Sequence, residues 1–248
     1  MKVQNQELLR SQCYANGQWI ENENGNRITV FDPATGEPVG SVPAMSGRET
    51  AAVIEAAHRA WPAWRALTAK ERSRLLRRWY DLLVAHHQDL AAIMTMEQGK
   101  PLAEAREEVL YGAGYIEWYA EEAKRVYGDT IPMAQQGKRI IVLKEPVGVC
   151  AAITPWNFPS SMISRKAAPA LAAGCPVVVK PASQTPFSAL ALAWLAGQAG
   201  IPPGVFNVVT GPAAEIGAEM TANPLGRKLS FTGSTAVEPV KQIGRAHV

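Results

Sequence analysis

Three short segments of this chain combine residues that can bind a negatively charged ligand. Residues 154–157 read Thr-Pro-Trp-Asn, residues 180–183 read Lys-Pro-Ala-Ser, and residues 231–234 read Phe-Thr-Gly-Ser. A lysine ammonium and the free N–H groups at the start of a helix attract phosphate, and an asparagine amide donates hydrogen bonds without taking up a proton. These residue types indicate an anion site, provided that the fold brings the segments together.

The second half of the chain shows the pattern of an α/β protein. Four apolar stretches alternate with alanine-rich stretches, at 147–153, 176–180, 205–209 and 228–231. Gly174 and Gly200 stand where the C-terminal caps of the intervening helices belong. Apolar strands separated by helices predict a parallel sheet that is covered on both faces. Ligands of such sheets bind beyond the carboxyl ends of the strands, where all three segments fall.

The first half of the chain predicts short strands and then helices. Turn residues and strand formers alternate between Tyr14 and Gly40. Ser46 and Thr68, each followed three residues later by glutamate, predict capping boxes at two helix starts. Gly99 is expected to end a third helix. We expect a fourth helix with Pro101 in its first turn to reach about residue 124, then an irregular stretch at 128–137 and a strand at 139–144.

The composition excludes several classes of protein. The chain has 248 residues, a net charge of +3 and 47% hydrophobic residues, which argues against nucleic-acid or membrane-surface partners. The longest apolar stretch, 167–179, is interrupted by prolines and glycine and is too short to span a bilayer. The first twelve residues lack the apolar core of a secretion signal. Three cysteines form no metal-binding spacing, so we expect no metal and a reduced, cytoplasmic location.

A family resemblance adds what the residues alone leave open. No Gly-x-Gly-x-x-Gly pattern follows any predicted strand, so a Rossmann-type fold would otherwise rest on architecture alone. From about residue 16 to residue 237, however, the sequence resembles the aldehyde dehydrogenase superfamily, closest to the succinate-semialdehyde dehydrogenases. The motifs at 154–159, 180–186 and 231–235 carry this resemblance, together with Glu-Gln-Gly-Lys-Pro at 97–101.

The resemblance implies a Rossmann-type site for NADP or NAD, a small aldehyde as substrate, and a homo-oligomer as the intact enzyme. The reaction it implies is oxidation of succinate semialdehyde, or a similar aldehyde, to the acid. The residues that it assigns to the cofactor are Ile153, Thr154, Pro155, Trp156, Asn157, Lys180, Ala182, Ser183, Gly211, Gly217, Phe231, Thr232, Gly233 and Ser234.

Each of the main candidates also has an ordinary structural explanation. In the family, the amide matching Asn157 stabilises the oxyanion of the reacting aldehyde; otherwise it would cap a turn between two prolines. Lys180 is expected to hold ribose hydroxyls or phosphate, and otherwise to be a solvated lysine at a strand end. Trp156 is expected to line the cofactor site through its backbone, although a buried aromatic is the default there.

Two further residues bear on specificity. Many NAD-preferring relatives carry a glutamate at the position of Ser183, which repels a 2′-phosphate; serine removes that repulsion and predicts that NADP is accepted. The alternative is a loop serine without a cofactor role. The resemblance assigns Arg165 to the carboxylate of the substrate, and a helix-surface arginine is the competing explanation.

The resemblance also predicts what the chain lacks. The family reaction needs a cysteine nucleophile and a general-base glutamate. Cys13, Cys150 and Cys175 do not match the context of that nucleophile, and Cys150 and Cys175, which fall in apolar surroundings, are expected to be core residues. We therefore expect an incomplete α/β enzyme that lacks its catalytic domain and is inactive alone. The alternatives are a non-catalytic fragment that binds NAD(P) or interacts with other subunits, and an aldehyde dehydrogenase with a different substrate preference.

The expected domains are residues 1–136 and 147–237 for NAD(P) binding and 137–146 for one strand of an oligomerisation hairpin whose partner is absent. Pro239 falls inside the expected next helix, so residues 238–248 are expected to be a non-native tail.

Overall fold

Four parallel strands form the centre of the structure, a computed structural model that describes residues 3–234. These strands are β7 (Val149–Ile153), β8 (Val177–Lys180), β9 (Phe206–Val208) and β10 (Gly226–Phe231). They lie in the order β10-β7-β8-β9. The sheet continues with β1 (Cys13–Ala15), which runs antiparallel to β9, and then with β2 (Gln18–Ile20), which runs antiparallel to β1. The predicted parallel sheet is therefore confirmed, with strand ends within two residues of the expected positions.

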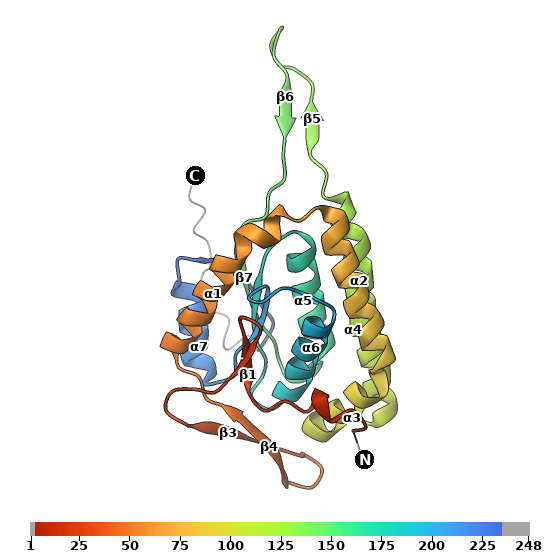
Figure 1. Cartoon of the computed structure of the whole chain (residues 1–248), viewed down its shortest axis with the longest axis vertical. Coiled ribbons are helices and arrows are strands. Elements are labelled where there is room, and N and C mark those ends of the chain that lie inside the picture. Colours follow the sequence, from red (N-terminus) through yellow and green to blue (C-terminus); the bar gives the residue numbers. More distant parts are fainter. Residues whose placement is uncertain (1–2, 235–248) are drawn as a thin grey trace.

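Helices cover both faces of this sheet in layers (Figure 1). On one face lie α1 (Gly47–Ala66) and α7 (Ala213–Ala222), and on the other lie α5 (Ser161–Ala172) and α6 (Pro186–Gln198). Three more helices pack outside α5 and α6, namely α2 (Ala69–Ala85), α3 (His87–Gln98) and α4 (Leu102–Glu122). Helix α6 is apolar on every side because the sheet and the outer helices enclose it.

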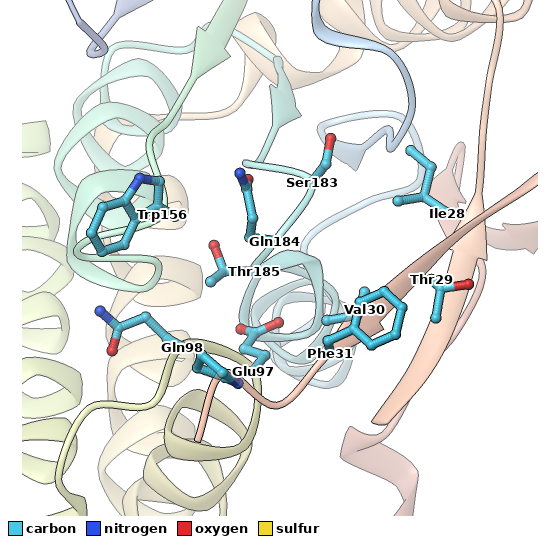
Figure 2. Close-up of a pocket in the computed structure, with 11 residues that line it drawn as sticks. Ile28, Thr29, Val30, Phe31, Glu97, Gln98, Trp156, Ser183, Gln184 and Thr185 are labelled. Carbon is cyan, nitrogen blue, oxygen red and sulfur yellow. The ribbon is translucent and has the colours of Figure 1, made fainter. Parts of the chain in front are cut away.

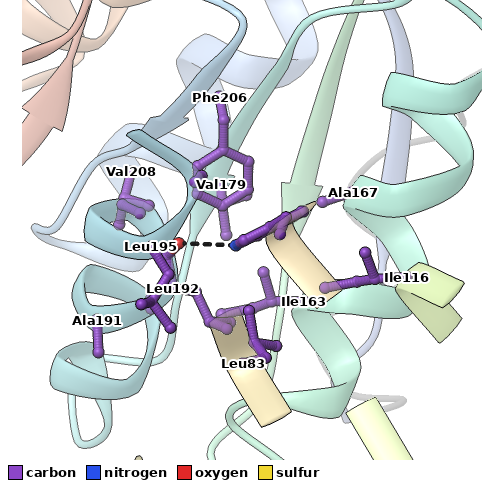
Figure 3. Packing of buried hydrophobic residues seen from close by; sticks show 14 of the residues in the cluster. Leu83, Ile116, Ile163, Ala167, Val179, Ala191, Leu192, Leu195, Phe206 and Val208 are labelled. Atoms are coloured by element: carbon purple, nitrogen blue, oxygen red, sulfur yellow. Dashed lines mark hydrogen bonds between the residues drawn. The ribbon is translucent and has the colours of Figure 1, made fainter. Parts of the chain in front are cut away.

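The main hydrophobic core lies between the sheet and the outer helices (Figure 3). Trp79 of α2 is fully buried and meets Phe206 of β9 edge to face, with ring centroids 5.2 Å apart. Its indole Nε1 donates a hydrogen bond to the backbone oxygen of Leu192 at 3.2 Å, which satisfies the polar atom of this large residue. The core thus fixes α2 against α6, which in turn begins at the end of the loop that follows β8.

The helix ends follow the predicted signals closely. Both predicted capping boxes form: the side chains of Ser46 and Thr68 accept the backbone N–H of the glutamate three residues on. Gly99 ends α3 with a φ of 80°, a left-handed conformation that glycine adopts without strain. Pro101 is the residue just before α4 and not within its first turn as predicted. Two short 3-10 helices complete the chain, η1 (Gln6–Leu8) and η2 (Ala123–Arg125).

Two hairpins project from the layers. One joins β3 (Arg27–Phe31) to β4 (Pro38–Pro43), and the other joins β5 (Asp129–Ile131) to β6 (Ile140–Val142). The second hairpin corrects two expectations. Residues 128–137, which were predicted to be irregular, contain β5. Strand β6, whose hairpin partner was expected to be absent, pairs with β5. The hairpin starts at Asp129, so the expected domain boundary at residue 137 would divide it.

One expectation concerns residues that the structure does not describe. The tail expected at residues 238–248 lies beyond residue 234 and outside the described residues. Among residues 3–234, no helix has the length and apolar character needed to cross a membrane.

Candidate functional site

Strand pairing brings the three predicted segments to one edge of the sheet. Phe231 of β10 pairs with Ile153 of β7, and Ile153 pairs with Lys180 of β8. Backbone hydrogen bonds continue past the strand ends, from Thr232 N to Ile153 O at 3.1 Å and from Thr154 N to Lys180 O at 3.1 Å. The carboxyl ends of three parallel strands therefore meet, as the sequence predicted.

Lys180 is a buried cation at this edge and not a solvated strand-end lysine. Its residue is 3% exposed, and within the described residues its ammonium donates only to Pro181 O, at 3.0 Å. Burial lowers the pKa of Lys180 to about 8 because the charged form loses hydration. The hydroxyl Oγ1 of Thr154 is likewise buried without a partner among the described residues. Free donors of this kind fit the ribose and phosphate oxygens of a dinucleotide.

The third segment has a neighbour that sequence reasoning missed. Gly233 and Ser234 are exposed beyond β10, and the ammonium of Lys166 on α5 donates to Thr232 Oγ1 at 2.5 Å. Burial lowers the pKa of this half-buried lysine. Lys166 is next to Arg165 in the sequence, but only the structure shows that Lys166 contacts Thr232 whereas Arg165 contacts Tyr111.

The two more distant glycines have different surroundings. Gly211 has a φ of +154°, and a Cβ there would lie 2.4 Å from the backbone oxygen of Met45. Close packing against Met45 therefore explains this glycine, and its cofactor role stays a prediction. A Cβ on Gly217 of α7 would lie 3.8 Å from the side chain of Ile153, so Gly217 does lie beside the strand-end site.

Ser183 and Trp156 line one cavity of about 490 Å³ (Figure 2). Trp156 is 53% exposed, so the default expectation of a buried aromatic is wrong here. Pro155 is half-buried and Ala182 is buried, on the same two loops. The other walls come from β3 and from the end of α3. Two of the predicted cofactor residues thus share a hollow large enough for part of a dinucleotide.

Glu108, which the sequence analysis did not single out, holds the loop that carries Asn157. The ammonium of Lys100 donates to Glu108 Oε2 at 2.5 Å and to the backbone oxygen of Asn157 at 3.1 Å. The other carboxylate oxygen, Oε1, accepts the backbone N–H groups of Ser160 at 3.1 Å and Ser161 at 3.3 Å, where α5 begins. A buried ion pair therefore ties α4 to the Asn157 loop.

The side chain of Asn157 itself is exposed. It makes no hydrogen bond to any of residues 3–234, so the turn-capping alternative finds no support. Its amide is available to an incoming ligand.

Glu97 supports the neighbouring loop in the same way. Its carboxylate accepts the backbone N–H groups of Phe187 at 2.6 Å and Ser188 at 2.8 Å, at the start of α6. Burial raises the pKa of Glu97 to about 8, and these N–H donors oppose the shift. The motif at 97–101 thus holds two loops in place: Lys100 contacts the loop after β7, and Glu97 contacts the end of the loop after β8.

Arg165 lies on α5 against an aromatic surface. Its Nη2 donates to the hydroxyl of Tyr111 at 3.2 Å, and its guanidinium lies 4.8 Å from the ring centroid of Tyr115. The Nε atom is buried without a partner among the described residues. A partly buried guanidinium with a free donor is suited to a carboxylate, and this environment differs from that of a freely solvated helix-surface arginine.

Comparisons with known proteins point to one family. A sequence model described as the aldehyde dehydrogenase family matches residues 19–246. A glutarate-semialdehyde dehydrogenase of Pseudomonas aeruginosa and the succinate-semialdehyde dehydrogenase [NADP(+)] GabD of Escherichia coli K12 are each 63% identical over 96% of this chain and 49% of the relative. A crystal structure described as an E. coli NADP-dependent enzyme matches with a TM-score of 0.95 and 62% identity, over 96% of this chain and 50% of that one. The chain spans about half the length of the curated relatives it matches.

Proposed function

The chain belongs to the aldehyde dehydrogenase family, and we propose that it supplies the dinucleotide site of an enzyme that oxidises an acid-bearing aldehyde to the acid. Succinate semialdehyde or a close analogue is the proposed substrate, and NADP or NAD is the proposed cofactor. The relatives named for succinate- and glutarate-semialdehyde oxidation support this choice.

One observation carries the proposal: Phe231, Ile153 and Lys180 are paired across three parallel strands, with Asn157 on the loop that follows the middle one. Ligands of parallel sheets bind at this edge. The buried ammonium of Lys180 and the hydroxyl of Thr154, which has no partner within residues 3–234, are donors of the kind that ribose and phosphate oxygens need.

Each residue has a distinct part in the proposed reaction. Lys180 would hold ribose or phosphate oxygens, and the backbone N–H groups of Gly233 and Ser234 would bind the pyrophosphate. The bound nicotinamide supplies the hydride acceptor for the aldehyde carbon. Asn157 donates its amide hydrogen bond to the aldehyde oxygen as negative charge develops there, and Arg165 orients the substrate through its carboxylate.

The cysteines of this chain are placed elsewhere. Cys13, Cys150 and Cys175 are its three cysteines, and all are buried. Cys175 lies before the start of β8, roughly 15 Å along that strand from Lys180, and burial raises the pKa of Cys13 to about 11. We propose that this polypeptide alone binds the cofactor but does not oxidise aldehyde, the role of a non-catalytic binding unit.

Titration with NADP and NAD tests the proposal directly. The purified chain should bind NADP saturably, followed by intrinsic tryptophan fluorescence or by calorimetry, without reducing it when succinate semialdehyde is added. If neither dinucleotide binds a chain that is shown by circular dichroism to be folded, the proposed function is wrong.

Ser183 provides a test of cofactor preference. Ser183→Glu should weaken NADP binding by at least tenfold and leave NAD binding within about threefold, since a carboxylate repels the 2′-phosphate. Gln136→Glu is the matched control, because it adds the same charge at an exposed residue that does not line this cavity. Equal losses for both dinucleotides, or for both variants, would contradict a role of Ser183 in discrimination.

Arg165 provides a test of the substrate class. In an enzyme active on aldehydes that contains this sequence, Arg165→Ala should raise KM for succinate semialdehyde by about 10- to 100-fold, the value of a lost charge-assisted hydrogen bond. KM for a neutral aldehyde of similar length should change little. Steady-state kinetics on both substrates make the comparison, and an equal rise in both KM values would reject the carboxylate contact.

The proposed partners follow from the family. We propose a homo-oligomer in which the hairpin β5–β6 takes part, because Ile131, Ile140, Ile141 and Leu143 leave an exposed apolar surface on it. A cytoplasmic location is also proposed, and the three free thiols accord with it.

A further inference from the structure

Two of the three cysteines are neighbours across adjacent strands. Cys150 is the second residue of β7, and Cys175 stands two residues before β8. The backbone N–H of Cys150 donates to the oxygen of Pro176 at 2.8 Å, and Cys150 pairs with Val177 in the sheet. Residues far apart in the sequence are thus brought side by side, at the opposite end of the strands from the dinucleotide site.

Both side chains line one cavity of about 290 Å³ between α5 and the sheet edge at β10. Each residue is nearly buried, with 6% of Cys150 and 3% of Cys175 exposed. Because a water molecule occupies about 30 Å³, this cavity has room for a small reagent beside the two sulfurs. Lys228 on β10 also lines it.

The surroundings make the two sulfurs chemically different. The side chain of Cys150 and the backbone N–H groups of Gly148 and Val147 act on the sulfur of Cys175 and, against the opposing effect of burial, lower its pKa to about 6. The charge of Lys228 acts in the same direction. The neighbouring Cys175 and burial both raise the pKa of Cys150, whose thiol donates to the backbone oxygen of Gly148 at 3.9 Å. The surroundings therefore favour the thiolate on Cys175 and the protonated thiol on Cys150.

Cys13 shows the contrast within the same chain. It is buried, its sulfur contacts Thr210 Oγ1 at 3.2 Å, and strand β9 separates its strand, β1, from β8 in the sheet. Burial raises the pKa of Cys13 to about 11, so this thiol is the inert kind.

We propose that Cys150 and Cys175 form a redox-active thiol pair that a small hydroperoxide converts to an intramolecular disulfide. Arg165 of the proposed substrate site also lines this cavity, but the inference does not depend on the proposed function, since the oxidation requires neither a dinucleotide nor an aldehyde.

The chemistry proceeds in two steps. The Cys175 thiolate attacks one oxygen of the hydroperoxide, the O–O bond breaks, and the leaving oxygen takes up a proton, which leaves a sulfenic acid on Cys175. The Cys150 sulfur then attacks the Cys175 sulfur, the S–S bond forms, and the hydroxyl group departs as water with the thiol proton of Cys150. The two thiols lose two electrons, and the hydroperoxide accepts both.

Differential alkylation with mass spectrometry tests the pair on the unmodified chain. The reduced protein is treated with hydrogen peroxide, the remaining thiols are alkylated after denaturation, and the peptides are quantified over time. A disulfide-linked Cys150–Cys175 peptide should form at least tenfold faster than Cys13 is oxidised. Oxidation of all three cysteines at similar rates, or no linked peptide while Cys150 and Cys175 are lost, would overturn the proposal.

Two conservative variants assign the roles. In Cys150→Ser, Cys175 should accumulate as a sulfenic acid that dimedone traps. In Cys175→Ser, the oxidation of Cys150 should slow at least tenfold. Melting curves establish that each variant is folded, and the wild-type comparison with Cys13 stands without them. A Cys175→Ser variant in which Cys150 reacts at the wild-type rate would also overturn the proposal.

Discussion

Replacing Glu108 with alanine should lower the free energy of unfolding by about 3–5 kcal/mol, the usual cost of leaving one partner of a buried ion pair alone. The side chain of Glu108 is 2% exposed and that of Lys100 is 11% exposed. Without the carboxylate, the Lys100 ammonium and the N–H groups of Ser160 and Ser161 lose their acceptor. Urea denaturation measures the change, and the melting temperature should fall by roughly 10 °C.

The neighbouring residue on α4 provides the control. Glu107 is exposed and forms no ion pair within residues 3–234, so Glu107→Ala should change stability by less than about 0.5 kcal/mol. The double variant Lys100→Met/Glu108→Leu should recover part of the loss, because it removes both buried charges. If Glu108→Ala were as mild as Glu107→Ala, the ion pair would not brace the Asn157 loop.

The sheet could be predicted because its signals are local. Strands β7, β8 and β9 lie in apolar runs that are each followed by a helix, and the capping boxes at Ser46 and Thr68 mark helix starts within four residues of sequence. Strand β5 could not be predicted in this way, since its Asp-Thr-Ile sequence becomes a strand only by pairing with β6. Local patterns therefore predicted the elements, and long-range pairing explains the exception.

The candidate site shows the same difference between local sequence signals and long-range contacts. Lys180, Thr154 and Phe231 could be placed together because strand ends of a parallel sheet share an edge. Glu108 could not be found, because a glutamate on a helix rich in charges is typical of a solvated face until the partner segment is known. The tertiary fold turns it toward α5, where it accepts two backbone N–H groups. Residues at the strand ends are thus easier to predict than the residues that hold the loops after them.

Replacing Lys180 with methionine should weaken NADP binding at pH 7 by about 10- to 100-fold, the value of a charge-assisted hydrogen bond of roughly 1.5–3 kcal/mol. Lys180 is 3% exposed, and the only acceptor it has among the described residues is Pro181 O. Lys70→Met is the control, because it removes one exposed charge at the start of α2. Calorimetric titration gives both affinities, and Lys70→Met should leave binding within about threefold.

The pH dependence of NADP binding separates the charge of Lys180 from its packing. Burial lowers the pKa of this ammonium to about 8 in the free protein, and a bound phosphate favours the charged form, so binding takes up a proton above that pH. Affinity should therefore be level from pH 7 to pH 8 and fall by up to tenfold per pH unit above it. The Lys180→Met variant should lose this slope, whereas Lys166→Met, which removes the other lysine of lowered pKa at this edge, should keep it. A slope that persists without Lys180 and vanishes without Lys166 would place the titrating cation on α5 instead of at the end of β8.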